Sequence, residues 1–126
     1  MATLTGTQII NVVDANSGLS QHYKFTPFAA SGDVGTAVNV FRHTRVTVQM
    51  TGNDYTGSLK VIAEGSLEDT SPTTFFPLTL GDATPTPVEF EADGGMLVGE
   101  NIKWIRLRAT VGSGSADATG YILALI

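Results

Sequence analysis

Apolar and polar side chains alternate strictly near the C-terminal end of the chain, over residues 104–111. One face of this stretch carries Ile105, Leu107, Ala109 and Val111. The opposite face carries Trp104, Arg106, Arg108 and Thr110. A period of two residues is typical of a β-strand with one buried face, and no helix can satisfy it. The pattern therefore predicts a half-buried strand over residues 104–111.

The chain continues with a polar, glycine-rich stretch and then with an apolar one. Residues 112–118 contain two glycines and two serines in succession, which predicts a turn. Residues 121–126 are apolar on both faces, which predicts a closing strand that is covered on both sides. Such a strand has to pack into the core of its own domain or against a neighbouring subunit.

Length and composition indicate a chain with one buried core and without a membrane-spanning helix. A chain of 126 residues with 42% hydrophobic content is long enough for one buried core. No window approaches the roughly 20 consecutive apolar residues of a membrane-spanning helix. Residues 1–6 have neither the basic start nor the apolar stretch of a secretion signal, so we expect the protein to stay where it is made or to leave by another route.

Cysteine count and charge exclude several kinds of site. The chain has no cysteine, which rules out disulfides, zinc–thiolate sites and thiol nucleophiles. Its formal net charge is −5, and the seven basic residues form no dense run. Nucleic-acid binding needs a clustered surface that neutralises phosphates. We therefore expect no nucleic-acid partner and no membrane partner.

Short candidate strands, separated by Gly, Pro, Asp and Asn, fill the rest of the chain. They cover residues 7–13, 22–25, 36–41, 45–51, 58–66, 75–80, 88–92 and 96–98. The inward side chains of the central strands are expected to be Val46, Val48, Met50, Leu59, Val61, Ala63, Val88 and Phe90. The stretches 45–51 and 58–66, joined by a turn at 52–57, form a predicted hairpin.

This pattern predicts an all-β fold with roughly eight to ten short strands. A single sheet with this many apolar side chains would expose one apolar face to water, so we expect two sheets packed face to face. We predict one antiparallel β-sandwich domain over residues 1–126, jelly-roll-like or immunoglobulin-like, with residues 1–8 as a candidate extended N-terminal arm. The Cys and Trp spacing of antibody domains is absent, and strand spacing leaves the order of the strands in each sheet open.

No residue pattern favours catalysis or metal binding. Glu89, Glu91 and Asp93 could in principle bind calcium or act as an acid–base pair, but they form a line rather than a converging shell, and a solvated strand face is the simpler interpretation. His22 and His43 lack any accompanying nucleophile or metal motif. We predict no catalytic residue, no metal ligand and no cofactor.

The polar face of the stretch 104–111 is the best candidate for an interface. A tryptophan flanked by arginines, here Trp104 with Arg106 and Arg108, is typical of protein interfaces and also of platforms that stack sugars. In the alternative interpretation Trp104 covers the edge of the core and the arginines pair with Glu89 or Glu91 on a neighbouring strand. Phe75 and Phe76 must point to opposite faces if they lie in a strand, so one of them is a second candidate anchor.

Two segments resemble a pattern of small structural proteins of tailed-phage virions. The first is residues 59–69, which end in Glu64-Gly65-Ser66-Leu67-Glu68-Asp69 and are followed by Phe75-Phe76-Pro77-Leu78. The second is residues 102–110, Ile-Lys-Trp-Ile-Arg-Leu-Arg-Ala-Thr, before the Gly/Ser stretch and the last apolar strand. Similar strands occur in carbohydrate-binding and adhesive sandwiches, and the first half of the chain carries no resemblance.

The resemblance implies a non-enzymatic virion protein, made in the host cytoplasm, that decorates or cements a capsid. A tail protein and a carbohydrate-binding module for host recognition are the alternatives. The implied partners are further copies of the chain, with a trimer favoured, and a major capsid or tail protein. The residues expected at these interfaces are Trp104, Arg106, Arg108, Phe75, Phe76, Ile9, Leu125 and Ile126.

Overall fold

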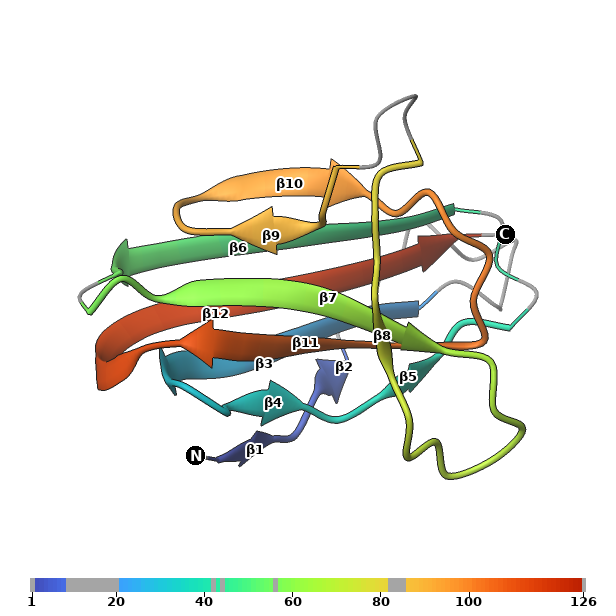
Figure 1. The fold of residues 1–126 in the computed structure, drawn as a ribbon, viewed down its shortest axis with the longest axis horizontal. Coiled ribbons are helices and arrows are strands. Elements are labelled where there is room, and N and C mark those ends of the chain that lie inside the picture. Colours follow the sequence, from blue (N-terminus) through green and yellow to red (C-terminus); the bar gives the residue numbers. More distant parts are fainter. Residues whose placement is uncertain are drawn as a thin grey trace.

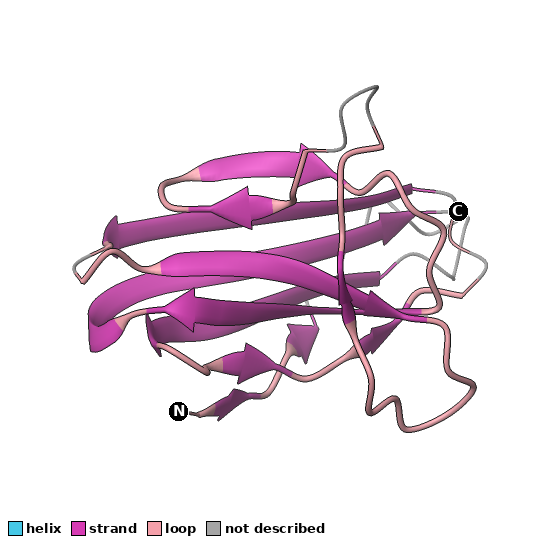
Figure 2. Ribbon diagram, viewed as in Figure 1, coloured by secondary structure: helices cyan, strands magenta, loops and turns pink. Residues whose placement is uncertain are grey.

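Two β-sheets packed face to face form the molecule (Figure 1). The computed structural model describes residues 2–8, 21–41, 43, 45–55, 57–81 and 86–125, and these contain strands, turns and loops without a helix (Figure 2). No helix long and apolar enough to cross a membrane occurs in this part of the chain. The predicted all-β sandwich is therefore confirmed, with twelve strands among the described residues in place of the expected eight to ten.

One sheet has seven strands and the other has five. In the seven-stranded sheet the order is β1 (Thr3–Leu4), β4 (Val34–Gly35), β11 (Trp104–Val111), β7 (Lys60–Ser66) and β8 (Phe76–Pro77), with β5 (Val38–Asn39) paired to β11 and β9 (Glu89–Phe90) paired to β7. In the five-stranded sheet the order is β10 (Gly94–Leu97), β6 (Arg45–Asp54), β12 (Ser113–Leu125), β3 (Gln21–Ala30) and β2 (Thr7–Gln8). Pairing is antiparallel except between β1 and β4.

The core lies between the sheets and contains the expected inward side chains. Those predicted for the central strands are all buried: Val46, Val48, Met50, Leu59, Val61, Ala63, Val88 and Phe90. Phe25 and Phe28 from β3 face the same space as Ile105 and Leu107 from β11. The period-two pattern was therefore sufficient to identify which face of each central strand is buried.

The predicted hairpin of residues 45–51 and 58–66 is wrong. β6 pairs with β10 and β12, whereas β7 pairs with β8, β9 and β11, so the two strands belong to different sheets. The turn between them, where Gly57 has a φ of 78°, carries the chain from one sheet to the other. Two amphipathic strands and a turn suit a hairpin and such an arch equally well, and only the pairing partners elsewhere in the chain decide between them.

The predicted turn over residues 112–118 is also wrong, since β12 begins at Ser113 and joins the five-stranded sheet. Ala116 and Ala118 face inward and are buried, so small residues continue the alternation that their polar neighbours conceal. At Gly112 a Cβ atom would lie 2.8 Å from the carbonyl oxygen of Ala29, so only glycine lets the chain cross here. Just before it, a bulge in β11 turns Val111 outward, and its predicted burial is wrong at 42% exposure.

The prediction that the closing strand is covered on both sides is wrong. β12 is central in the five-stranded sheet, with Ile122 and Ala124 in the core. On its other face Tyr121, Leu123 and Leu125 are half-buried. Neighbouring strands flank these side chains instead of a second layer, because a sandwich has only one interior.

The N-terminal residues take part in the sandwich itself. Thr3 and Leu4 pair with β4, and Thr7 and Gln8 pair with β3, so the candidate arm supplies a strand to each sheet of its own chain. Ala2 is held by Asp33, whose carboxylate also accepts hydrogen bonds from the amides of Ala29 and Ala30 at 2.9 Å each. Burial opposes ionisation of Asp33, but these three amides lower its pKa overall.

Candidate protein-binding surfaces

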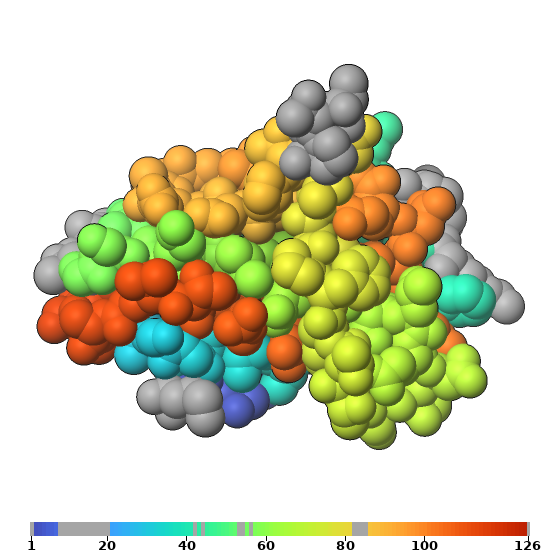
Figure 3. Space-filling view, in the orientation of Figure 1, coloured from blue at the N-terminus to red at the C-terminus, as the bar shows by residue number. Residues whose placement is uncertain are grey.

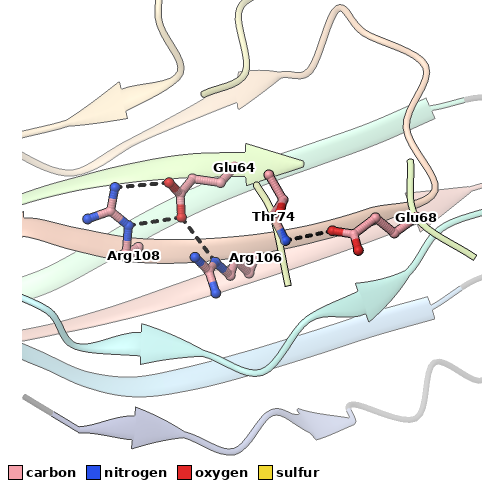
Figure 4. A network of polar contacts seen from close by, with 5 residues as sticks. All are labelled: Glu64, Glu68, Thr74, Arg106 and Arg108. Atoms are coloured by element: carbon pink, nitrogen blue, oxygen red, sulfur yellow. Dashed lines mark hydrogen bonds and ion pairs between the residues drawn. The ribbon is translucent and has the colours of Figure 1, made fainter. Parts of the chain in front are cut away.

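The polar face of β11 lies on the outer side of the seven-stranded sheet, where it meets a glutamate of β7. Register places Arg106 directly opposite Glu64, with Arg108 one step diagonal to it. The Nε atom of Arg106 donates to Oε1 of Glu64 at 3.0 Å, and Arg108 donates through Nε and Nη2 to both carboxylate oxygens at 2.9 Å each (Figure 4). One carboxylate thus accepts three charge-assisted hydrogen bonds.

This network is largely removed from water. The side chain of Glu64 is 6% exposed, against 26% for Arg106 and 35% for Arg108. Burial alone would raise the pKa of Glu64, but the hydrogen bonds and charges of the two arginines outweigh it and lower the pKa. The alternative interpretation, in which these arginines pair with Glu89 or Glu91, is wrong, because both arginines pair with Glu64, and Glu89 and Glu91 instead lie 3.1 Å from the Nζ atom of Lys60.

The loop between β7 and β8 crosses the outer side of the same sheet and covers part of it (Figures 1 and 3). Glu68 closes this loop, since its carboxylate accepts hydrogen bonds from the amides of Thr73 at 3.0 Å and Thr74 at 2.6 Å, which lower its pKa. Its backbone carbonyl accepts the indole N–H of Trp104 at 2.9 Å. Trp104 therefore anchors the loop to the sheet, as a half-buried tryptophan with a polar partner can.

Two phenylalanines follow in the same segment and differ in their surroundings. The guanidinium carbon of Arg106 lies 3.7 Å from the ring centroid of Phe75, a close cation–π contact. Phe76, the next residue, is 38% exposed. Phe75 lies just before β8 and packs on Arg106, whereas Phe76, the first residue of β8, is exposed, so the two rings differ in their surroundings although the strand in the structure does not include Phe75.

Four of the predicted interface residues thus form one cluster: Trp104, Arg106, Arg108 and Phe75. Their polar groups have partners within the chain, and the carboxylate that holds the arginines, Glu64, was not singled out from the sequence. The signal that could have found it is the pairing of residues 60–66 with 104–111, which puts Glu64 opposite Arg106. Ile9 and Ile126, also predicted at an interface, lie outside the described residues.

The outer side of the five-stranded sheet has a different character. We call Leu97, Tyr121, Leu123 and Leu125 the apolar outer face. Leu97 and Leu123 are both register partners of Thr47, so they flank it on neighbouring strands. Leu97 is 52% exposed and the other three are half-buried. Leu125 was expected at an interface from the sequence, and it belongs to this face.

Basic side chains border the apolar outer face. Lys24 pairs in register with Tyr121, and Arg45 pairs with Leu125. His22 is opposite Leu123, and its ring centroid is 6.1 Å from that of Tyr121. In a chain of net charge −5, this border is basic. An apolar centre with a charged rim is the usual anatomy of a protein interface.

A hollow of about 490 Å³ lies at one end of the sandwich. It is lined by Phe41, His43, Leu67, Asp69, Asn101, Ile102 and Lys103. Phe41 and Leu67 are 56% and 66% exposed, and the Nζ atom of Lys103 lies 5.2 Å from the ring centroid of Phe41 and 3.2 Å from a carboxylate oxygen of Asp69. The hollow combines an exposed aromatic ring with hydrogen-bonding groups. Among the described residues, no group of three His, Asp or Glu side chains could hold a metal ion.

Comparisons with known proteins identify the fold. No family model matches the chain, and no curated protein matches it. Among solved structures, the SPBc2 prophage-derived protein YomS has a TM-score of 0.56 to this structure with 15% sequence identity. The likeness covers 92% of this chain and 96% of that protein. The chain therefore has the β-sandwich fold of a prophage-derived protein over nearly its whole length.

Proposed function

We propose that this chain is a non-enzymatic structural protein of a phage virion, which decorates the capsid and stabilises it through protein–protein contacts. The fold likeness to a prophage-derived protein supports a phage context, because it spans almost the whole of both chains. The strand pattern of residues 59–69 and 102–110 points in the same direction. Fold alone does not imply function, so the proposal rests on a surface as well.

The apolar outer face is the observation that carries the proposal. Tyr121, Leu123 and Leu125 follow one another along the outer side of β12, and Leu97 of β10 lies across Thr47 of β6 from Leu123 and is more than half exposed. Burying such side chains against a partner is favourable by about 25 cal/mol per Å² of apolar surface. The basic border at Lys24 and Arg45 suits a partner with acidic groups around an apolar patch. A subunit of the capsid shell is the proposed partner, and the virion is the proposed location.

Purified particles test the proposal directly. We expect mass spectrometry of virions from the phage or prophage that encodes the chain to detect it at a fixed ratio to the major capsid protein. Gold-labelled antibody should mark the head; label on the tail would indicate the alternative role of tail component. Absence of the chain from particles that retain their other structural proteins would overturn the virion role.

A matched pair of variants tests the surface. Leu123→Glu puts a carboxylate in the apolar outer face, whereas Leu67→Glu puts one on an exposed leucine at the end of the sandwich. Particles that lack the chain should rebind the wild type and the Leu67 variant, and rebind the Leu123 variant at least tenfold less. Thermal unfolding of each variant verifies that the domain is folded. Equal binding of all three proteins would remove the apolar outer face from the proposal.

The end hollow supports a second candidate function, sugar binding in host recognition. Phe41 offers an exposed ring for stacking, and Asp69 and Asn101 offer hydrogen-bonding groups beside it. The indole of Trp104, the platform suggested by the sequence, is half-buried and donates to Glu68. A glycan array probed at micromolar protein, with Phe41→Ala as control, tests this candidate. If the array shows no glycan whose binding is weakened by Phe41→Ala, the result counts against sugar binding.

A further inference from the structure

Strand β10 is an edge of the five-stranded sheet, with β6 on one side and no strand of the described residues on the other (Figure 1). The amide of Val98 donates to the carbonyl of Val46, which fixes the phase of the ladder. In an antiparallel pair, alternate residues bond to the partner strand. Gly94 and Met96 therefore face β6, and the amide and carbonyl groups of Gly95 and Leu97 point away from it.

Within Gly94–Leu97 the edge carries none of the features that usually prevent strands from joining, and residues 79–81 cover only its continuation, where the amide of Gly99 donates to the carbonyl of Thr79 at 2.9 Å. β10 reads Gly-Gly-Met-Leu, without a charge and without a proline. Natural edge strands are commonly protected by lysine, proline or a bulge, because an open row of N–H and C=O groups recruits another strand. The register of β10 with β6 is regular over all four residues, so the edge is not twisted away by a bulge.

We propose that β10 pairs antiparallel with β10 of a second copy of this chain, about a two-fold axis at Met96. This register puts Gly95 opposite Leu97 of the second copy, and Leu97 opposite its Gly95. Each of these pairs exchanges both of its N–H···O bonds, because all four residues point their backbone groups outward. The edge is thus self-complementary, which a two-fold contact requires. The two five-stranded sheets become one continuous sheet.

Side chains fit the same register. A Cβ atom built on Gly95 would meet nothing closer than the carbonyl oxygen of Val48 at 3.7 Å, so there is open space beside this glycine. Leu97, which is 52% exposed, would lie across that space from the other copy. The pairing buries the most exposed leucine of the apolar outer face and joins that face to its counterpart.

On the inner side of the sheet the two Met96 side chains meet at the axis. Met96 borders a hollow of about 370 Å³ together with Pro87, Glu89 and Glu91. The methionine of the second copy lies where it can fill the mouth of this hollow, and methionine adapts well to irregular gaps. The two carboxylates at the rim share the ammonium group of Lys60 at 3.1 Å, which reduces their repulsion between copies.

This pairing rests on the proposed function, for which it supplies the contact between copies of the chain. Sequence resemblance favoured a trimer, but an edge that is complementary to itself closes after two copies. A ladder of four residues is small beside the roughly 800 Å² per partner of a standard interface. The expected dimer is therefore weak in dilute solution and is strengthened when copies are held on a shell.

An engineered cysteine tests the register, because the chain has no other thiol. Met96→Cys would place two cysteines in a non-hydrogen-bonded pair, with Cα atoms about 4.5–5.5 Å apart, which suits a disulfide. Leu97→Cys would place them more than about 8 Å apart, beyond disulfide reach. Leu67→Cys, exposed at the end of the sandwich, measures random collision. The readout is the rate of covalent dimer formation under mild oxidation at about 100 µM protein, with circular dichroism to verify folding.

We expect Met96→Cys to form dimer at least tenfold faster than either control, and Leu97→Lys in the Met96→Cys background to abolish the difference. Equal rates for the three cysteines would overturn the proposal, as would a trimer or larger ring in solution that Leu97→Lys leaves intact. Equal cross-linking rates in a protein that still binds virions would reject the edge pairing and leave the proposed function standing.

Discussion

The two outer sides of the sandwich use similar strand patterns for opposite purposes. On the seven-stranded sheet, Glu64 accepts hydrogen bonds from two arginines, and the loop anchored by Trp104 places Phe75 over Arg106. On the five-stranded sheet, Leu97 and Leu123 lie on either side of Thr47, and no loop of the described residues is hydrogen-bonded across them. The first side has its interaction groups paired within the chain. The second presents apolar surface that a partner can bury.

This contrast shows why residue type alone is a poor guide to an interface. Trp104, Arg106 and Arg108 have the composition of an interface hot spot, and here each has an internal partner. Internal pairing lowers the gain from a new partner, because old hydrogen bonds have to be exchanged for new ones. Changes on the first side should therefore affect folding most, and changes on the second side should affect association most.

Removal of the central carboxylate should have the largest effect on stability. Glu64→Ala leaves two partly buried guanidinium groups without their acceptor, and we expect the free energy of unfolding to fall by about 3 kcal/mol. Urea unfolding measures the change. Glu91→Ala is the matched control, since its side chain is 65% exposed and its pairing with Lys60 is worth less than about 1 kcal/mol. Similar losses for both variants would show that Glu64 has no special structural role.

Acid should weaken the same side of the sandwich. The pKa of Glu64 is lowered in the folded protein, so the unfolded chain binds this proton first as the pH falls. The stabilisation is fully present above the ordinary value of 4.5 and is lost as the pH falls through the lower folded pKa. Unfolding free energy measured from pH 6 to pH 2 should decline, and less steeply in Glu64→Gln. Some slope should remain, because the pKa values of Asp33 and Glu68 are lowered as well.

Removal of one hydrogen bond from the covering loop should have a moderate effect. Trp104→Phe keeps an aromatic ring and loses the indole N–H that reaches the carbonyl of Glu68. We expect a loss of about 1 kcal/mol in stability and faster proteolysis within residues 67–75. A variant with unchanged stability and unchanged proteolysis would show that Trp104 does not anchor the loop.

The smallest effect on folding is expected on the other side. Leu123→Thr places a good strand former on the apolar outer face, so we expect the unfolding free energy to change by less than about 1 kcal/mol. The same substitution should weaken association with any partner that covers this face, measured by light scattering or particle binding. A loss of stability as large as that of Glu64→Ala would indicate that Leu123 belongs to the core, and the contrast between the two sides would fail.

Period-two alternation predicted most of the strands and the buried side chains of the central ones, but it did not single out Phe25, Phe28, Val40 or Leu78, which are also buried. It failed where local composition and long-range pairing disagree. Residues 112–118 look like a turn, but Ala116 and Ala118 continue the inward face, and pairing with β3 and β6 outweighs the weak strand preference of glycine and serine. Residues 45–51 and 58–66 look like a hairpin, but each pairs better with strands far away in the sequence.

For the candidate surfaces, too, some properties could be predicted from the sequence and others depended on the tertiary structure. The sequence alone determined that the fold is all-β, which side chains of the central strands enter the core, and that Trp104, Arg106 and Arg108 share one strand face, because these properties depend on a local period of two. Only the tertiary structure decided that Glu64 pairs with those arginines, that Thr47 lies between Leu97 and Leu123, and that β10 is an edge. Each of these depends on which strands become neighbours, and that is set by the packing of the whole chain rather than by any one segment.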